Sequence, residues 1–117
     1  MKVLIIINDA PYGTEKAYNA LRMAMALQKH HSDVKVRVFL LADSVGCAVA
    51  GQETPRGYYN IERMLKSIIA NDGEVKTCGT CLDARGLTQV ALAQGAERSN
   101  MQEFSDWVVD ADKIMTF

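Results

Sequence analysis

The sequence has no long apolar run, and this absence excludes a membrane-spanning protein. The longest runs, among them residues 3–7 and 38–42, are five residues each, whereas a helix that crosses a bilayer needs about 18–20 apolar residues. Lys2 and the first run have the start of a secretory signal peptide, but Asn8 and Asp9 end the run before an apolar region of about 7–15 residues is complete. We therefore expect a cytoplasmic protein with no membrane partner.

Charge of either sign is not concentrated anywhere along the chain. Thirteen basic and fourteen acidic residues give a formal net charge of -1. No block of lysine or arginine forms the basic patch that binds a phosphate backbone or an anionic lipid surface. We therefore expect no direct contact with nucleic acid.

Cysteine is scarce and the second half of a zinc site is missing. The three cysteines are an odd number in a chain of 117 residues, which is long enough to bury a core without disulfides. Cys78 and Cys81 form the single CxxC pair, and the histidines, His30 and His31, are expected at the far end of the first helix. Four zinc ligands are therefore not available within one subunit. We predict no metal, no organic cofactor, and thiols that act as reactive groups.

Apolar segments alternate between strand and helix patterns in the first half of a single expected domain, residues 1–117. A continuous β-branched run is typical of a strand buried on both faces, and we expect it at the centre of the sheet. Thr14 is a good N-cap for the first helix. The elements expected here are a strand at 2–8, a helix from Thr14 to about 29, a strand at 34–41, a short helix at 42–50 and a loop at 51–59.

The second half contains the clearest helix, which begins after Asn60 and ends at Gly73. A third strand at 74–77 then leads directly into Cys78. The later elements expected are a short helix at 87–92, a small strand from Ala96 and Glu97, a helix with an Asn100 and Glu103 capping box that buries Met101, Phe104 and Val108, and a final strand at 113–117. This order predicts a three-layer α/β domain with a mostly parallel, about five-stranded sheet and helices on both faces.

The CxxC pair lies at the position where chemistry is usually found in such a domain. Ligands and reacting groups collect outside the carboxyl ends of parallel strands. Asn8 follows the first strand, Asp43 follows the second, and Cys78 follows the third, so we expect all three at one edge. The turn with Tyr12 and Gly13 adds free backbone N–H groups, but it lacks the lysine of a Walker loop and the spacing of GxGxxG, which disfavours a nucleotide site.

Two features of the sequence favour a thiolate at Cys78. The pKa of a thiol falls from about 8.5 beside a cation or at a helix N-terminus. A helical turn that begins at Thr80 or Cys81 would direct N–H groups at Cys78, and Arg85 is close enough in sequence to approach it. Alternatively, Arg85 is a solvated surface charge and Gly86 an ordinary turn glycine. We expect a sulfur atom that is reachable from solvent and readily ionised.

Three interpretations of the CxxC pair compete. In a dithiol redox pair the first thiol attacks and the second resolves the mixed disulfide. Half of a zinc site is disfavoured by the missing ligands. A persulfide carrier needs only Cys78, and Cys81 then protects it or is incidental. Elsewhere, Cys47 is expected to be a small buried hydrophobe, and Trp107 to serve packing or a subunit interface.

Four segments resemble the DsrE/DsrF-like family, and most closely its YchN branch. They are VLIIINDAPYGTE at 3–15, GQ at 51–52 with GYYNI at 57–61, VKTCGTCLDARG at 75–86, and ADKIMTF at 111–117. The resemblance spans essentially the whole chain. It implies a parallel α/β domain assembled into homo- or hetero-hexamers, often as stacked trimers. In the DsrE and TusD branch it also implies a cysteine that carries persulfide sulfur before an Arg-Gly pair; these correspond to Cys78, Arg85 and Gly86.

The resemblance leads us to expect an intracellular sulfur-relay protein, a sulfurtransferase-type carrier. Cys78 would accept sulfane sulfur from a donor protein and pass it to an acceptor protein. A homo-oligomer, a trimer or hexamer, is the expected assembly. The residues expected to line the site or stabilise the thiolate are Asn8, Tyr12, Gly13, Asp43, Arg85 and Gly86. The sulfur-relay members commonly lack a cysteine at the position of Cys81, so two alternatives stay open: a dithiol oxidoreductase in which Cys81 is the resolving thiol, and a non-catalytic oligomeric binding module.

Overall fold

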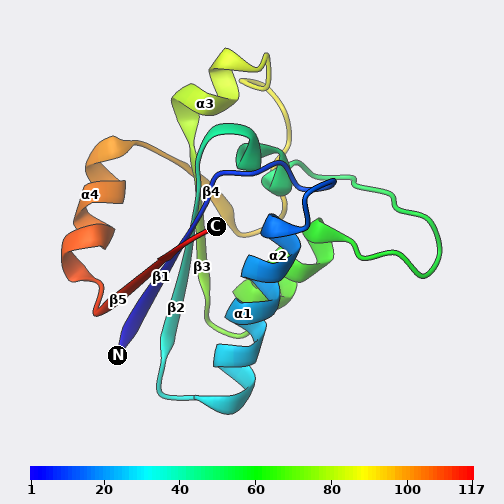
Figure 1. Ribbon diagram of the computed structural model, residues 1–117. Helices are drawn as coiled ribbons and strands as arrows, with labels where there is room; N and C mark the ends of the chain where they lie inside the picture. Colours follow the sequence, from blue (N-terminus) through cyan, green and yellow to red (C-terminus); the bar gives the residue numbers. More distant parts are fainter.

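The β-branched run at the start of the chain forms the first of five parallel strands in the computed structural model, which describes residues 1–117 (Figure 1). Its apolar side chains are buried on both faces, as the pattern predicts. The elements in chain order are β1 (Lys2–Ile7), α1 (Lys16–His30), β2 (Lys35–Leu40), the 3-10 helix η1 (Ala42–Ala48), α2 (Ile61–Ala70), β3 (Glu74–Cys78), α3 (Gly79–Ala84), β4 (Ala96–Ser99), α4 (Met101–Asp110) and β5 (Lys113–Thr116).

The strand order is β4-β3-β2-β1-β5, and every neighbouring pair is parallel. The predicted α/β class is therefore confirmed. The central strand is β2, however, and the expectation that β1 lies at the centre is wrong. The chain extends the sheet in one direction from β1 through β4, and only β5 returns to the other side of β1. Ile5 consequently pairs with Val38 of β2 on one side and with Met115 of β5 on the other.

The helices α1 and α2 cover one face of the sheet and α4 covers the other (Figure 1). One core cluster joins β1 residues such as Ile5 to Leu21 of α1 and Leu65 of α2. A second cluster contains Leu4, Phe39, Val45, Cys78, Leu82 and Trp107. The two clusters reflect the period of two along each strand, which sends neighbouring side chains to opposite faces.

The helix α4 buries Trp107 in place of the predicted Met101 and Val108, whereas the predicted Phe104 is half-buried and stacks on Phe39 with the ring centroids 4.3 Å apart. Met101 is 65% exposed and Val108 is 37% exposed, whereas Trp107 is buried. The Trp107 ring packs edge-on against Phe39, and two cations, Arg37 and Lys76, lie over the ring at 5.3 and 4.9 Å from its centroid. The expectation that Trp107 serves packing is confirmed, because the large ring covers more of the sheet than the residues at the ends of the helix.

The helix termini follow the sequence signals with two exceptions. Asn60 Oδ1 accepts from the N–H of Arg63 and caps α2, as expected. The N-cap of α1 is Glu15, in the left-handed region with φ 65°, rather than Thr14. The Thr14 hydroxyl donates to Asp9 at 2.8 Å and so holds the preceding loop. At Asn100 the cap accepts from the N–H of Glu103, but the Glu103 side chain accepts from Ser99 instead of completing the capping box.

The predicted helix at 87–92 is absent, and a short helix occurs earlier, directly after β3. Gly86, with φ 70°, ends this helix α3. The N–H of Gly86 donates to the Asp83 carbonyl and the N–H of Leu87 to the Leu82 carbonyl, at 3.1 and 2.9 Å. This pair of bonds is a Schellman motif, which requires the left-handed residue that glycine supplies. The chain therefore leaves the helix at the point where a new one was expected to begin.

No helix of the chain has both the length and the apolar character that spanning a membrane requires.

Candidate functional site

Cys78 is the last residue of β3 and the N-cap of α3, so the thiol lies at the carboxyl edge of the sheet, as the sequence predicts (Figure 1). The residue is more covered than we expected, with 7% of its surface exposed. It packs in the same apolar cluster as Leu82 and Trp107. Cys78 is buried because α3 turns back immediately after the strand and places Leu82 against the sheet.

The sulfur of Cys78 is surrounded by hydrogen-bond partners from the first turn of α3. The N–H of Cys81 donates to Cys78 Sγ at 3.3 Å, and the Thr80 hydroxyl lies 3.4 Å from the same sulfur. The Cys81 sulfur in turn accepts from the N–H of Ala42 at 3.4 Å. Ala42 has φ 51°, a left-handed conformation that is uncommon for alanine. The loop after β2 thus contributes a donor to the second thiol of the pair.

The two thiols ionise in a definite order. Burial raises the pKa of Cys78, but hydrogen bonds from Cys81 and Thr80 outweigh burial and leave that pKa below its ordinary value. Burial and the hydrogen bond to Cys78 raise the pKa of Cys81. Cys78 is therefore the thiol of the pair that ionises more readily.

Arg85 faces the second cysteine. Its guanidinium binds Asp43 at 2.9–3.0 Å and donates to the Cys81 carbonyl at 3.0 Å. Its charge lowers the pKa of Cys81, although burial and Cys78 have larger effects in the opposite direction. The structure thus brings Asp43, Cys81 and Arg85 together, but the expected pairing of Arg85 with the Cys78 thiolate is replaced by an ion pair with Asp43.

A different arginine lies beside the start of α3, and the sequence analysis did not include it. Arg98 of β4 forms an ion pair with Asp83 of α3 at 2.6 Å, and its guanidinium lies against Gly79. A negatively charged Cys78 raises the pKa of Arg98, after the larger effects of Asp83 and of burial. The signal was present: residues 98 and 99 end a strand parallel to β3, so they reach the same edge as Cys78.

The remaining predicted site residues lie along the same edge or behind it. The backbone N–H of Asn8 donates to the Phe117 carbonyl. The Tyr12 hydroxyl donates to Gln52 at 2.6 Å and accepts from the N–H of Ile61 at 3.2 Å. Tyr12 packs against the α1 and α2 core cluster, whereas Cys78 belongs to the cluster on the other face. A role for Asn8, Tyr12 and Gly13 as walls of the Cys78 site stays a prediction.

The third cysteine takes no part in this arrangement. Cys47 lies in η1 with none of its surface exposed, and burial raises its pKa to about 12. The expectation of a small buried hydrophobe is confirmed. A thiol with this pKa stays protonated at neutral pH, so Cys47 is not the nucleophile of this protein.

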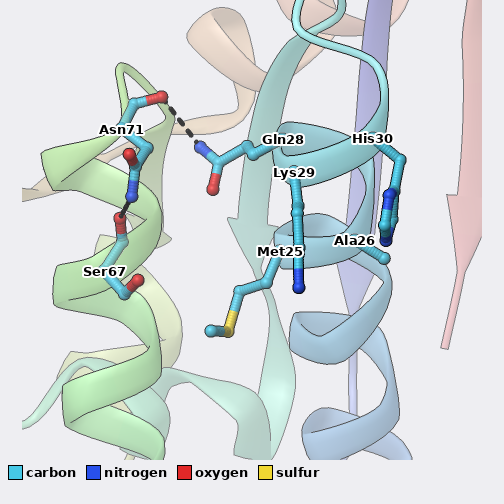
Figure 2. A pocket seen from close by; sticks show the side chains of 7 residues that line it. All are labelled: Met25, Ala26, Gln28, Lys29, His30, Ser67 and Asn71. Atoms are coloured by element: carbon cyan, nitrogen blue, oxygen red, sulfur yellow. Dashed lines mark hydrogen bonds between the residues drawn. The ribbon is translucent and has the colours of Figure 1, made fainter.

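A separate hollow of about 440 Å³ lies between the last turns of α1 and α2, near the amino ends of the strands (Figure 2). Gln28 spans it and donates to the carbonyls of Ile68 and Asn71 at 2.9 and 3.0 Å. The side chains around it include Lys29 and His30 but no thiol. The hollow therefore reflects helix packing at the edge of the sheet opposite Cys78.

Comparison with known proteins gives consistent matches over the full length. The profile of the DsrE/DsrF-like family matches residues 1–117. Protein YchN of Escherichia coli (strain K12) is 40% identical over 116 residues, which are 99% of this chain and 98% of the relative. Protein MJ0989 of Methanocaldococcus jannaschii is 37% identical over 117 residues, the whole of both chains.

Solved structures show the same fold. The crystal structure of the ychN protein from E. coli superposes with a TM-score of 0.94 at 40% identity, covering 99% of this chain and 98% of that one. The protein MTH1491 from Methanobacterium thermoautotrophicum superposes with a TM-score of 0.77 at 13% identity, covering 99% and 97%. The second match is a likeness of fold alone.

Proposed function

The chain belongs to the DsrE/DsrF-like family, which is associated with sulfur relay, and from this premise we propose that it is a persulfide carrier that acts through Cys78. The observation that supports the proposal is the set of donors around one sulfur. The N–H of Cys81 and the Thr80 hydroxyl contact Cys78 Sγ within 3.4 Å. These contacts stabilise negative charge on the atom that would accept sulfur.

The transfer balances without an added oxidant. The Cys78 thiolate attacks the outer sulfur of a donor hydropersulfide, R–S–SH. The donor S–S bond breaks, and R–S⁻ leaves with the electron pair. Cys78 then carries S–SH, and the reverse exchange delivers the sulfur to an acceptor thiolate. One S–S bond is made and one is broken, so the step calls for neither a metal nor an organic cofactor.

Intact mass spectrometry after incubation with a persulfide donor tests the proposal. We expect an adduct of about 32 Da, the mass of one sulfur atom, which thiol reductants remove. The Cys78→Ser variant should lack the adduct, and Cys81→Ser should retain most of it. A wild-type protein without an adduct on Cys78 would end the proposal.

The proximity of the two thiols supports a second candidate, a dithiol oxidoreductase. The pair is hydrogen-bonded, and the lower pKa belongs to the first cysteine, as in a nucleophile with a resolving partner. This function predicts a reversible Cys78–Cys81 disulfide at a physiological potential. Cys81→Ser would then abolish activity, whereas a carrier keeps most of its function. The same variant therefore separates the two candidates.

The partners in the proposal are a sulfur donor protein, an acceptor protein and further copies of this chain in a trimer or hexamer. Light scattering of the purified protein measures the number of subunits. A binding module without chemistry would share the assembly but not the reactivity. Its Cys78 would titrate near the ordinary thiol value of about 8.5 and react slowly with alkylating reagents.

A further inference from the structure

The contact between Gly79 and Arg98 explains why residue 79 has no side chain. A Cβ atom added to Gly79 would lie 2.9 Å from Nε of Arg98 and 3.0 Å from its Cζ and Nη2. Contacts this close do not occur, so the guanidinium occupies the space that a side chain would fill. Gly79 does not have a positive φ. Its role is therefore to admit Arg98, and not to form a special turn.

Arg98 is held in this place from two directions. The β4 strand pairs Arg98 with Thr77 and Ser99 with Cys78, so the arginine is delivered to the end of β3. Asp83, one turn along α3, binds its Nη2 at 2.6 Å. An ion pair of this kind orients the planar guanidinium more than it stabilises the fold, because both side chains are more than two-fifths exposed.

An open hollow of about 440 Å³ lies over the same place. Its lining consists of two adjacent segments, the start of α3 and the end of β4 with the first residues of α4. Arg98 is the only charged residue among them. The lining residues are Gly79, Thr80, Arg98, Ser99, Asn100 and Met101. A reagent in this hollow, which is next to Cys78 along the chain, meets the guanidinium of Arg98, and the partner carboxylate of Asp83 lies outside the lining.

We propose that Arg98, positioned by Asp83 and by the absence of a side chain at Gly79, is the cation that holds the sulfur anion at Cys78. The anion is the thiolate before transfer and the persulfide anion after it, so the role rests on the proposed function. Arg98 is a positioning residue that favours anionic sulfur compounds over neutral ones. Arg85 has a different role, because its guanidinium lies beside Cys81, where it binds Asp43 and the Cys81 carbonyl.

The charged and titratable groups around Cys78 set the direction of the test. Arg98 from β4 and Asp83 from α3 lie on the side of the hollow. Cys81 and the Arg85–Asp43 pair lie on the side of the loop after β2. Replacing Arg98 removes the positive charge on the hollow side and leaves the other side unchanged.

The test compares two alkylating reagents that differ mainly in charge, iodoacetate and iodoacetamide. The rate of modification of Cys78 is measured for each by peptide mass spectrometry at low ionic strength, and the ratio of the two rates cancels differences in access. For Arg98→Met we expect the iodoacetate to iodoacetamide ratio to fall by about fivefold, the effect of one nearby charge in partly screened surroundings. Arg98→Lys keeps the positive charge and should therefore retain part of the wild-type rate ratio.

Two further variants distinguish position from mere presence of charge. Gly79→Ala keeps Arg98 in the chain but displaces its guanidinium, so the ratio should fall with no loss of folding, because the far end of a flexible side chain moves easily. Arg85→Met is the matched control and should leave the ratio within about twofold. A ratio unchanged in both Arg98→Met and Gly79→Ala, or a fall confined to Arg85→Met, would overturn the inference.

This experiment uses no sulfur donor, so its outcome is independent of sulfur transfer. A fall in the ratio together with a missing persulfide adduct would sink the relay function and leave the role of Arg98 standing. An intact adduct in Arg98→Met together with an unchanged reagent ratio would leave the relay function standing and overturn the role of Arg98.

Discussion

The backbone N–H of Cys81 donates to the sulfur of Cys78 at 3.3 Å, so the second cysteine supports negative charge on the first. Burial raises the pKa of Cys78, but the donors from Cys81 and Thr80 lower it further than burial raises it. The thiolate fraction near neutral pH should therefore exceed that of an ordinary cysteine and should fall as the pH drops through the lowered pKa. We expect the rate of alkylation of Cys78, measured against pH, to have a midpoint below about 8.5.

Variants of Cys81 check the cause of this shift. Cys81→Ala removes the side-chain donor and should raise the midpoint, whereas Cys81→Ser keeps a hydroxyl donor and should change it less. A wild-type midpoint at or above the ordinary thiol value would contradict the assignment of Cys78 as the thiolate.

The carboxylate of Glu62 should make the free energy of unfolding decrease at acidic pH. Burial raises the pKa of its carboxylate, but the N–H groups of Gln52 and Gly51, at 2.9 and 3.0 Å, and nearby Lys66 leave the pKa below its ordinary value. A carboxylate whose pKa falls on folding contributes stability above about pH 4.3, and the contribution is lost as the pH falls through the lowered pKa. Glu62→Gln should lower the free energy of unfolding by about 1–2 kcal/mol at pH 7.

Urea unfolding at pH 7 and near pH 3.5 measures this effect. The wild-type protein and Glu62→Gln should differ at neutral pH and converge in acid. A difference of equal size at both pH values would show that the loss comes from packing and not from the charge.

Trp107 is expected to be the residue of α4 on which docking of that helix depends. The residue is 7% exposed, and Arg37 and Lys76 lie over its ring. Trp107→Ala should lower the free energy of unfolding by about 3–5 kcal/mol, because the cavity left behind cannot be filled. Val109 on the same helix is 87% exposed. Val109→Ala should change the free energy of unfolding by less than about 0.5 kcal/mol. Similar urea midpoints for the two variants would contradict the prediction.

The hydroxyl of Thr77 has no hydrogen-bond partner within the chain, although the residue is fully buried. Thr77→Val replaces this hydroxyl with a methyl group of similar size and should raise the free energy of unfolding by about 1 kcal/mol. Ser44 is an equally buried control whose hydroxyl donates to the carbonyls of Ile7 and Leu41. Ser44→Ala should therefore be destabilising by about 1–2 kcal/mol. A loss of stability in Thr77→Val, measured by urea unfolding, would reveal a partner for the hydroxyl.

The fold was predictable where a segment carries its own signal. The β-branched run at residues 2–8, the Asn60 cap and the apolar spacing of α2 each identified an element, because period and capping are local properties. The helix expected at 87–92 had no such signal and does not form. The helix that does form, α3, lies before Gly86. The six residues of α3 are held by Cys78 as their cap and by Leu82 against the sheet. Those contacts exist only after the strands have paired.

The site was predictable to the same extent. The segments that hold Asp43 and Cys78, one just after β2 and one at the end of β3, had to share an edge, and the structure joins them through Ala42 and Cys81. The partner of each charge was not predictable. Arg85 lies seven residues from Cys78 but binds Asp43, whereas Arg98 lies much farther along the chain and reaches the start of α3 through β4.

The sequence by itself determined the α/β class, the position of the CxxC pair at the end of a strand and the burial of Cys47, because hydrophobic period and the succession of strands and helices can be read along the chain. Only the tertiary structure decided how far Cys78 is covered and which carboxylate each arginine binds. These properties depend on distances between side chains from different strands. The order in which the strands pair sets those distances, and no single segment contains it.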